Sequence, residues 1–152
     1  MRRLSAAGTA EAPGLGVEGF RASHEQARDA QRCARIAGRR AAAVTSFESI
    51  RFVDLLSRDL PAARAFVESE LGDLAAGDER SEGLREFLLV LLEKEGDATA
   101  TAAALGVHRN TVRQRLARAE ELRGRPVTQN GAELRAALAL THALGAAVLR
   151  DA

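Results

Sequence analysis

The side chains best suited to chemistry lie close together in one stretch of the sequence, residues 108–118. Arginine pairs with guanine, and asparagine or glutamine with adenine, through two parallel hydrogen bonds at the base edge. Arginine also neutralises backbone phosphates, which releases counterions and favours binding. This stretch supplies all of these groups, so the chemistry that it predicts is DNA recognition. The residues that we expect to contact DNA are His108, Arg109, Asn110, Thr111, Arg113, Gln114 and Arg118.

Some of these residues have a structural explanation as well. Asn110 and Thr111 suit the first turn of a helix, where their side chains satisfy free backbone N–H groups. A histidine such as His108 is more often a packed or capping residue than a DNA ligand. Arg115 lies near the edge that we expect to be buried, so an internal ion pair is as well supported as a phosphate contact.

A helix-turn-helix is the element that would present this stretch to DNA. Its first helix needs a small residue where the second helix crosses, and Ala102 fits that place. Four residues later Gly106 fits the turn, which needs a positive φ. The apolar residues expected to lock the two helices together are Leu105, Val107, Val112 and Leu116.

The second helix divides into two faces at 100° per residue. Val112, Leu116 and Ala119 fall on one side, and the other side carries Asn110, Arg113, Gln114, Ala117 and Arg118. The pattern predicts a recognition helix over about residues 108–119. Its N-terminal half would enter the major groove, so the best candidates for reading bases are Arg109, Asn110, Arg113 and Gln114.

Positive charge concentrates in the same region. The whole sequence has 22 Lys and Arg against 21 Asp and Glu, a net charge of +1. Between residues 108 and 125, six arginines stand against two glutamates, a local net of +4. A basic cluster in a nearly neutral chain is typical of a phosphate-binding surface, although a solvated helix face has the same composition.

The remaining sequence predicts a mainly α-helical protein in two parts. Ala and Leu, which favour helices, supply much of the 46% hydrophobic content. We expect a disordered start over 1–13, a small α/β segment over 14–75, a glycine-rich acidic linker over 76–83, and a helical DNA-binding domain over 84–152. The predicted elements are helices from Ser23, around 52–56, from Pro61, over 84–95 and over 132–149, and a strand at 43–47.

The sequence also resembles a known family. Leu105–Leu116 (LGVHRNTVRQRL) and Glu121–Gly124 (ELRG) closely resemble the C-terminal helix-turn-helix of PucR/CdaR-type bacterial transcriptional regulators. The recognition helix is also similar to that of Fis-type nucleoid proteins. Upstream, Gly19–His24 and the Ala-rich helix after it resemble part of a degenerate GGDEF-like α/β domain that precedes the DNA-binding domain in this family.

The resemblance implies a sequence-specific regulator of transcription that binds double-stranded DNA, with an effector small molecule that the sequence does not identify. One recognition helix reads only a short half-site, so we expect a homodimer. Two departures from the family matter. The family has strands before the segment that corresponds to Gly19–His24. We therefore expect the α/β segment here to be incomplete, as in a fragment of a longer regulator or a shortened gene product. Gln114 stands where the family often has an aromatic residue.

Other functions find less support. Gly14–Gly19 spells G-x-G-x-x-G, but no apolar strand precedes it and no acidic residue follows at the spacing that a dinucleotide needs. The three histidines are scattered and no GGDEF sequence occurs, so we expect no catalytic residues, no metal and no cofactor. Cys33 is the sole cysteine, which excludes an intramolecular disulfide.

The longest apolar run, residues 87–92, is far too short for a membrane span, and we expect a cytoplasmic protein with no membrane partner. The alternative to specific DNA binding is a helical protein-interaction or dimerisation module that uses the apolar helices 84–92 and 134–148. A truncated regulator without specific DNA binding is the other alternative.

Overall fold

The computed structural model describes residues 47–150, with side chains from Phe52 onward. In chain order the elements are α2 (Phe47–Leu56), α3 (Leu60–Leu71), the 3₁₀ helix η2 (Gly72–Ala75), α4 (Glu79–Glu93), α5 (Ala98–Leu105), α6 (Arg109–Arg123), α7 (Gly131–Leu144) and the 3₁₀ helix η3 (Gly145–Ala147). No strand occurs between residues 47 and 150, where the β-type pairing is an isolated bridge between Ala76 and Arg150. None of the helices described is long and apolar enough to cross a membrane.

Aspartates fix the start of three consecutive α-helices. Asp59, Asp78 and Asp97 precede α3, α4 and α5, and the carboxylate of each accepts a hydrogen bond of 2.7–3.0 Å from a backbone N–H in the first helical turn. These N–H groups have no partner within the helix, so the caps stabilise helix formation at these positions by about 1 kcal/mol each. Local sequence therefore decides where these helices begin.

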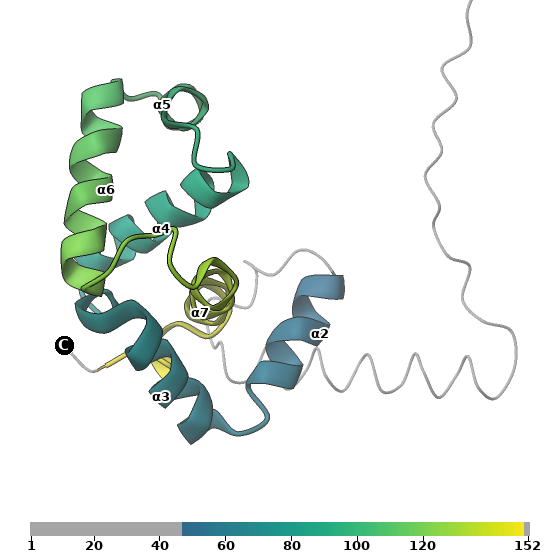
Figure 1. The fold of residues 1–152 in the computed structure, drawn as a ribbon. Helices are drawn as coiled ribbons and strands as arrows, with labels where there is room; N and C mark the ends of the chain where they lie inside the picture. Colours follow the sequence, from purple (N-terminus) through teal and green to yellow (C-terminus); the bar gives the residue numbers. More distant parts are fainter. Residues whose placement is uncertain (1–46, 151–152) are drawn as a thin grey trace, which may run out of the picture.

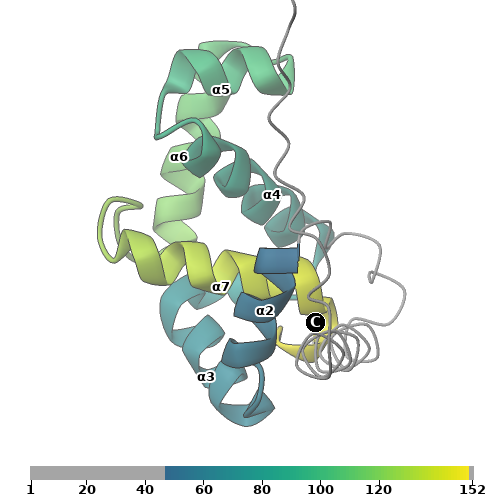
Figure 2. The ribbon, with the colours of Figure 1, turned by 90° about the vertical axis from the view of Figure 1, so that its right-hand side faces the viewer.

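Helix α7 lies at the centre of the arrangement. Figures 1 and 2 show it between α4 on one side and α2 with α3 on the other, and it contacts all three of these helices. Helix α5 and the N-terminal part of α6 extend away from α7, at the far side of α4 (Figure 1). The end of the molecule formed by α5 and the start of α6 therefore packs on α4.

One hydrophobic core joins all of these helices. Phe87 of α4 is 1% exposed, and Leu134 and Leu138 of α7 are fully buried. Val67 and Leu71 of α3 belong to the same cluster. The further fully or almost fully buried members include Leu74, Leu88, Leu91, Val112, Ala119, Leu140 and Leu144. Helices that precede and follow residues 76–83 thus share a core.

The segment predicted as a linker contains the beginning of a helix. Asp78 caps α4 by accepting from the Ser81 backbone N–H at 2.9 Å and from its hydroxyl at 2.7 Å, and residues 79–83 form the first part of α4. The acidic residues Glu79 and Glu82 lie in the first turn, where the positive end of the helix dipole stabilises them. The acidic composition of residues 76–83, which suggested a flexible linker, is also the composition of a helix N-terminus. The division of the chain into domains stays a prediction.

The α/β segment predicted over 14–75 finds no support in the part that the structure describes. Residues 47–75 form α2, α3 and η2, so the strand predicted at 43–47 is wrong at Phe47, and residues 43–46 lie outside the described range. The predicted helix from Ser23, the Gly14–Gly19 motif and Cys33 also lie outside it. The helix predicted from Pro61 is confirmed, and the one predicted over 132–149 ends at Leu144, after which the chain tightens into η3.

Candidate nucleic-acid interface

The turn between α5 and α6 depends on a glycine in the left-handed region. Gly106 has φ 63° and ψ 32°, and the Val107 N–H after it donates to the Ala102 carbonyl at 3.0 Å. An added Cβ at Gly106 would meet no atom within 4 Å, so the requirement for glycine is conformational rather than steric. The turn predicted from the sequence is confirmed at this residue.

Small and apolar side chains lock α5 against α6. Ala102 and Ala119 are buried, and Val112 is fully buried between the helices and the core. Leu105, Val107 and Leu116 pack against the same core and are partly buried. The small residues let the helix backbones approach closely, and the apolar ones give the second helix one fixed rotation about its axis. The spacing predicted this apolar side of α6, and α5 and α6 do contact each other.

His108 is the N-cap of α6. Its backbone is extended (φ −76°, ψ 150°), and its Nδ1 accepts a hydrogen bond from the Asn110 N–H at 3.2 Å. The capping role left open for Asn110 therefore belongs to His108. The Asn110 side chain is exposed.

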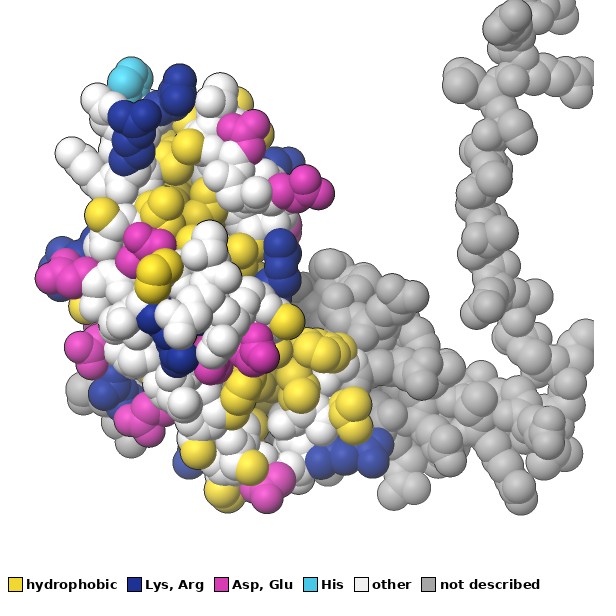
Figure 3. All heavy atoms as spheres, viewed as in Figure 1, with side chains coloured by type: hydrophobic (Ala, Val, Ile, Leu, Met, Phe, Trp, Pro, Cys, Tyr) yellow, Lys and Arg dark blue, Asp and Glu magenta, His cyan; other side chains and the backbone are white. Residues whose placement is uncertain are grey.

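The N-terminal half of α6 presents the predicted DNA-contacting side chains outward. His108, Arg109, Asn110, Arg113 and Gln114 are exposed, whereas Thr111 and Arg118 are half-buried. Figure 3 shows a histidine and basic side chains gathered at the end of the molecule that α5 and α6 form. The geometry brings the seven predicted residues onto α6 and its N-cap, and five of them are exposed. Arg115 is exposed too, and no ion pair to it occurs within the described residues.

The basic cluster of residues 108–125 is divided by tertiary structure. Arg109, Arg113 and Arg115 are exposed, and Arg118 pairs with Glu121 through Nη1 and Oε2 at 2.5 Å. The last two arginines of the cluster, Arg123 and Arg125, pair instead with Glu70 of α3. The local net charge of +4 thus overstates the positive charge available to a phosphate backbone.

Arg123 anchors the C-terminus of α6 to α3. It is 4% exposed, and its guanidinium donates to the Glu70 carbonyl at 3.0 Å, to Glu70 Oε2 at 3.2 Å, to the Pro126 carbonyl at 2.6 Å and to the Gln129 carbonyl at 2.9 Å. Burial lowers the pKa of Arg123, and the Glu70 carboxylate acts in the opposite direction. Arginine does not lose its proton in proteins, so Arg123 stays positively charged beside the Glu70 carboxylate. The four hydrogen bonds satisfy its buried N–H groups.

A glycine in the turn after α3 allows the close approach between α3 and α6. Gly72 has φ +56°, and a Cβ built there would lie 2.8 Å from the Leu122 carbonyl oxygen and 3.1 Å from that of Arg123. Arg125 also donates to the Ser69 carbonyl in this region. Sequence reasoning missed this contact and the Glu70 pair because the partners lie about fifty residues apart. The short-range signal available was the position of Gly72 directly after the helix, where glycine is common.

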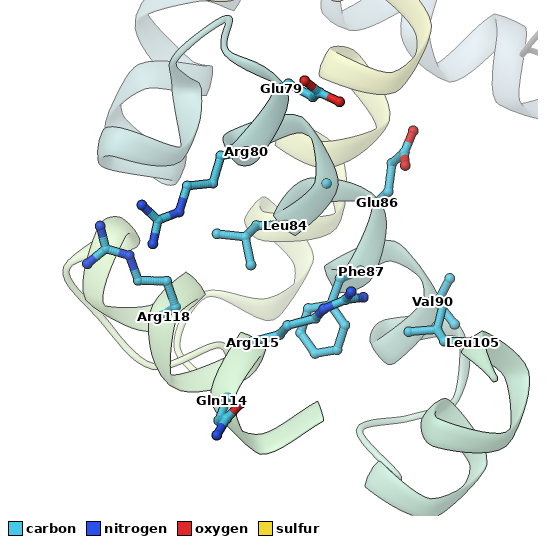
Figure 4. A pocket seen from close by; sticks show the side chains of 11 residues that line it. Glu79, Arg80, Leu84, Glu86, Phe87, Val90, Leu105, Gln114, Arg115 and Arg118 are labelled. Carbon is cyan, nitrogen blue, oxygen red and sulfur yellow. The ribbon is translucent and has the colours of Figure 1, made fainter. Parts of the chain in front are cut away.

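A hollow opens beside α6, between it and α4. Its volume is about 660 Å³, and Figure 4 shows the residues that line it. Leu84, Phe87 and Val90 of α4 and Leu105 of α5 supply apolar side chains. The polar side chains are Glu79, Arg80, Glu86, Gln114, Arg115 and Arg118. Three of these come from α6, so the hollow adjoins the candidate DNA-contacting surface.

The geometry described so far is that of a helix-turn-helix with a polar, partly basic second helix. Residues 84–141 match the family of PucR C-terminal helix-turn-helix domains. This PucR-type match begins within α4 and ends within α7, so it includes the turn at Gly106 and the whole of α6. It agrees with the resemblance drawn from residues 105–124.

Two relatives are similar to part of this chain. The transcriptional activator PmfR of Paenarthrobacter nicotinovorans is 41% identical over 78 residues, which cover 51% of this chain and 17% of that protein. An uncharacterised protein in the pkwA 5′ region of Thermomonospora curvata is 47% identical over 58 residues, 38% of this chain and 32% of that protein. The chain therefore spans less than a third of the length of each. No solved structure gives a significant match.

The PucR-type match and the likeness to part of a transcriptional activator support the DNA-binding helix-turn-helix that the sequence predicted.

Proposed function

We propose that this chain acts as a sequence-specific, DNA-binding transcriptional regulator of the PucR/CdaR type, with α6 as the recognition helix in the major groove of double-stranded DNA. The observation that carries the proposal is the exposed N-terminal half of α6, which a glycine turn and the buried Val112 hold in a fixed orientation. Arg109, Arg113 and Gln114 on this surface have the donors and acceptors that distinguish base edges. In this proposal His108 and Thr111 contact backbone phosphates.

The test is a titration of duplex DNA from upstream of the chain's own gene, followed by fluorescence anisotropy at several salt concentrations. We expect saturable binding, and we expect Arg113→Ala to weaken binding to this DNA by about tenfold or more, which is the range for losing a contact to a base edge. Binding to unrelated DNA should weaken much less. Equal, weak binding to all DNA would remove the claim of sequence specificity, and absence of binding by the folded protein at low salt would overturn the proposal.

We also propose that two copies bind two half-sites, because one recognition helix contacts only a few base pairs. The stoichiometry of the same titration tests this. Two chains per duplex support a dimer, and one chain per duplex contradicts it. The cytoplasmic location and the absence of enzyme activity stay proposals that rest on the residues of the sequence, and the GGDEF-like character of the upstream segment stays one that rests on the resemblance.

The alternative of a helical interaction module is less well supported. It required the apolar faces of residues 84–92 and 134–148 to be available to a partner. Leu84, Phe87 and Leu91 are instead buried in the shared core, together with Leu134 and Leu138. These faces are used within the chain itself.

A further inference from the structure

We propose that Arg80 of α4 and Arg118 of α6 form a clamp for one phosphate of the DNA backbone beside the recognition helix. The proposal rests on the proposed DNA-binding function and extends its site to a second helix. Arg80 is not among the residues that the sequence predicted to contact DNA. The clamp is defined by these two arginines.

The two arginines face each other from different helices. Both line the hollow of about 660 Å³ between α4 and α6, and both also line a neighbouring hollow of about 510 Å³. Figure 4 shows their guanidinium groups turned toward one another, while Glu79 and Glu86 point away from them. Two positive groups in this arrangement repel each other unless an anion lies between them.

Donors of the clamp are free to bind an anion. Arg118 uses Nη1 for Glu121, but its Nε is buried and has no hydrogen-bond partner among the residues described. Arg80 is exposed and forms no ion pair within the described part of the chain. An unsatisfied buried donor costs free energy, so an anion that draws the Arg118 side chain into the hollow would relieve this cost.

The carboxylates nearest to the clamp in the second hollow have other partners. Asp78 accepts two hydrogen bonds from Ser81 at the start of α4. Asp73 pairs with Arg150 Nη2 at 3.0 Å. Neither carboxylate forms an ion pair with Arg80 or Arg118 within the described residues, but the hydrogen-bonded Asp78 keeps its negative charge.

The position of the clamp favours a DNA phosphate as the anion. At 100° per residue, Arg118 lies on the flank of α6, between the outward face of Asn110 and Gln114 and the buried face of Val112. A helix with its side chains is about 10–12 Å wide and the major groove about 12 Å, so backbone phosphates run along both flanks of a recognition helix. Guanidinium groups bind phosphate through paired, charge-assisted hydrogen bonds.

The experiment compares Arg80→Gln and Arg118→Gln with the unchanged chain on the same upstream duplex and on an unrelated duplex. Each change removes one positive charge, and Arg64→Gln is the matched control because Arg64 is an exposed arginine of α3, away from α6. We expect roughly three- to tenfold weaker binding to both duplexes for each clamp variant. The slope of log affinity against log salt concentration should fall by about the amount that one phosphate contact contributes. The control should bind like the unchanged chain.

A second measurement locates the phosphate. Replacing single phosphates of the duplex by neutral methylphosphonates should reveal one position that weakens the unchanged chain but no longer affects Arg80→Gln. Arg80→Gln and Arg118→Gln variants that match Arg64→Gln in affinity and salt dependence would overturn the clamp. If the clamp variants have no effect but Arg113→Ala weakens binding, the proposed function stands and only the clamp is rejected. No DNA binding by the unchanged chain would overturn both.

Discussion

At the scale of single residues, Glu121 is the side chain of α6 that we expect to oppose DNA binding. It is exposed, pairs with Arg118, and at 100° per residue lies on the same face as Asn110 and Gln114. Glu121→Gln removes a negative charge that would face phosphates and releases Arg118, so we expect affinity for DNA to rise about two- to fivefold at low salt. Anisotropy titrations at increasing salt check this, because the gain should shrink as salt screens the charges.

The matching control at this scale is Glu133→Gln, which removes an exposed negative charge from the first turn of α7 instead of α6. It changes net charge by the same amount, so a rise in affinity equal to that of Glu121→Gln would assign the effect to overall charge. If Glu121→Gln binds DNA more weakly than the unchanged chain, the face of α6 that carries Glu121 does not lie against DNA.

At the scale of elements, the contact between the end of α3 and the end of α6 fixes how the recognition helix is attached. Gly72→Ala places a Cβ 2.8 Å from the Leu122 carbonyl oxygen at a residue with φ +56°. We expect the free energy of unfolding to fall by about 1–3 kcal/mol, since both the strained φ and the collision must be relieved. Thermal or urea unfolding followed by circular dichroism measures this change.

Gly83→Ala is the control for that measurement. Gly83 lies within α4, and a Cβ there meets no atom within 4 Å. Alanine should stabilise the helix by about 0.5–1 kcal/mol, because glycine loses more conformational freedom on folding. Equal effects of the two substitutions would mean that the close approach at Gly72 contributes nothing to stability.

At the scale of the whole molecule, the PucR-type match begins at residue 84, but the packing begins earlier. Val67, Leu71 and Leu74 are fully buried in the core that α4 and α7 share, and Glu70 neutralises the buried Arg123. We expect a fragment of residues 77–152 to unfold at a much lower temperature than one of residues 47–152. The loss of several core side chains, at about 2–5 kcal/mol each, is comparable to the whole stability of a domain. Melting curves that coincide would show that α4 to α7 fold alone, as the predicted boundary at 76–83 implies.

Local signals made much of this protein predictable from its sequence. Gly106, Ala102 and the apolar spacing around Val112 predicted the helix-turn-helix, because a turn and the helices beside it depend on residues within a few positions of one another. Pro61 likewise predicted the start of α3. The same local rules misled at residues 79–83, where an aspartate cap outweighed the linker-like composition.

The sequence by itself determined the positions of the helices and the kinds of side chain on α6, because these depend on neighbours along the chain. Tertiary structure alone decided which arginines face outward. Arg123 is identical in type to Arg113, yet Arg123 is buried because Glu70, 53 residues away, offers it a carboxylate, while nothing in the described chain covers Arg113. Arg80 joins Arg118 only because α4 and α6 pack side by side. Such pairings depend on contacts between distant segments, which no local pattern records.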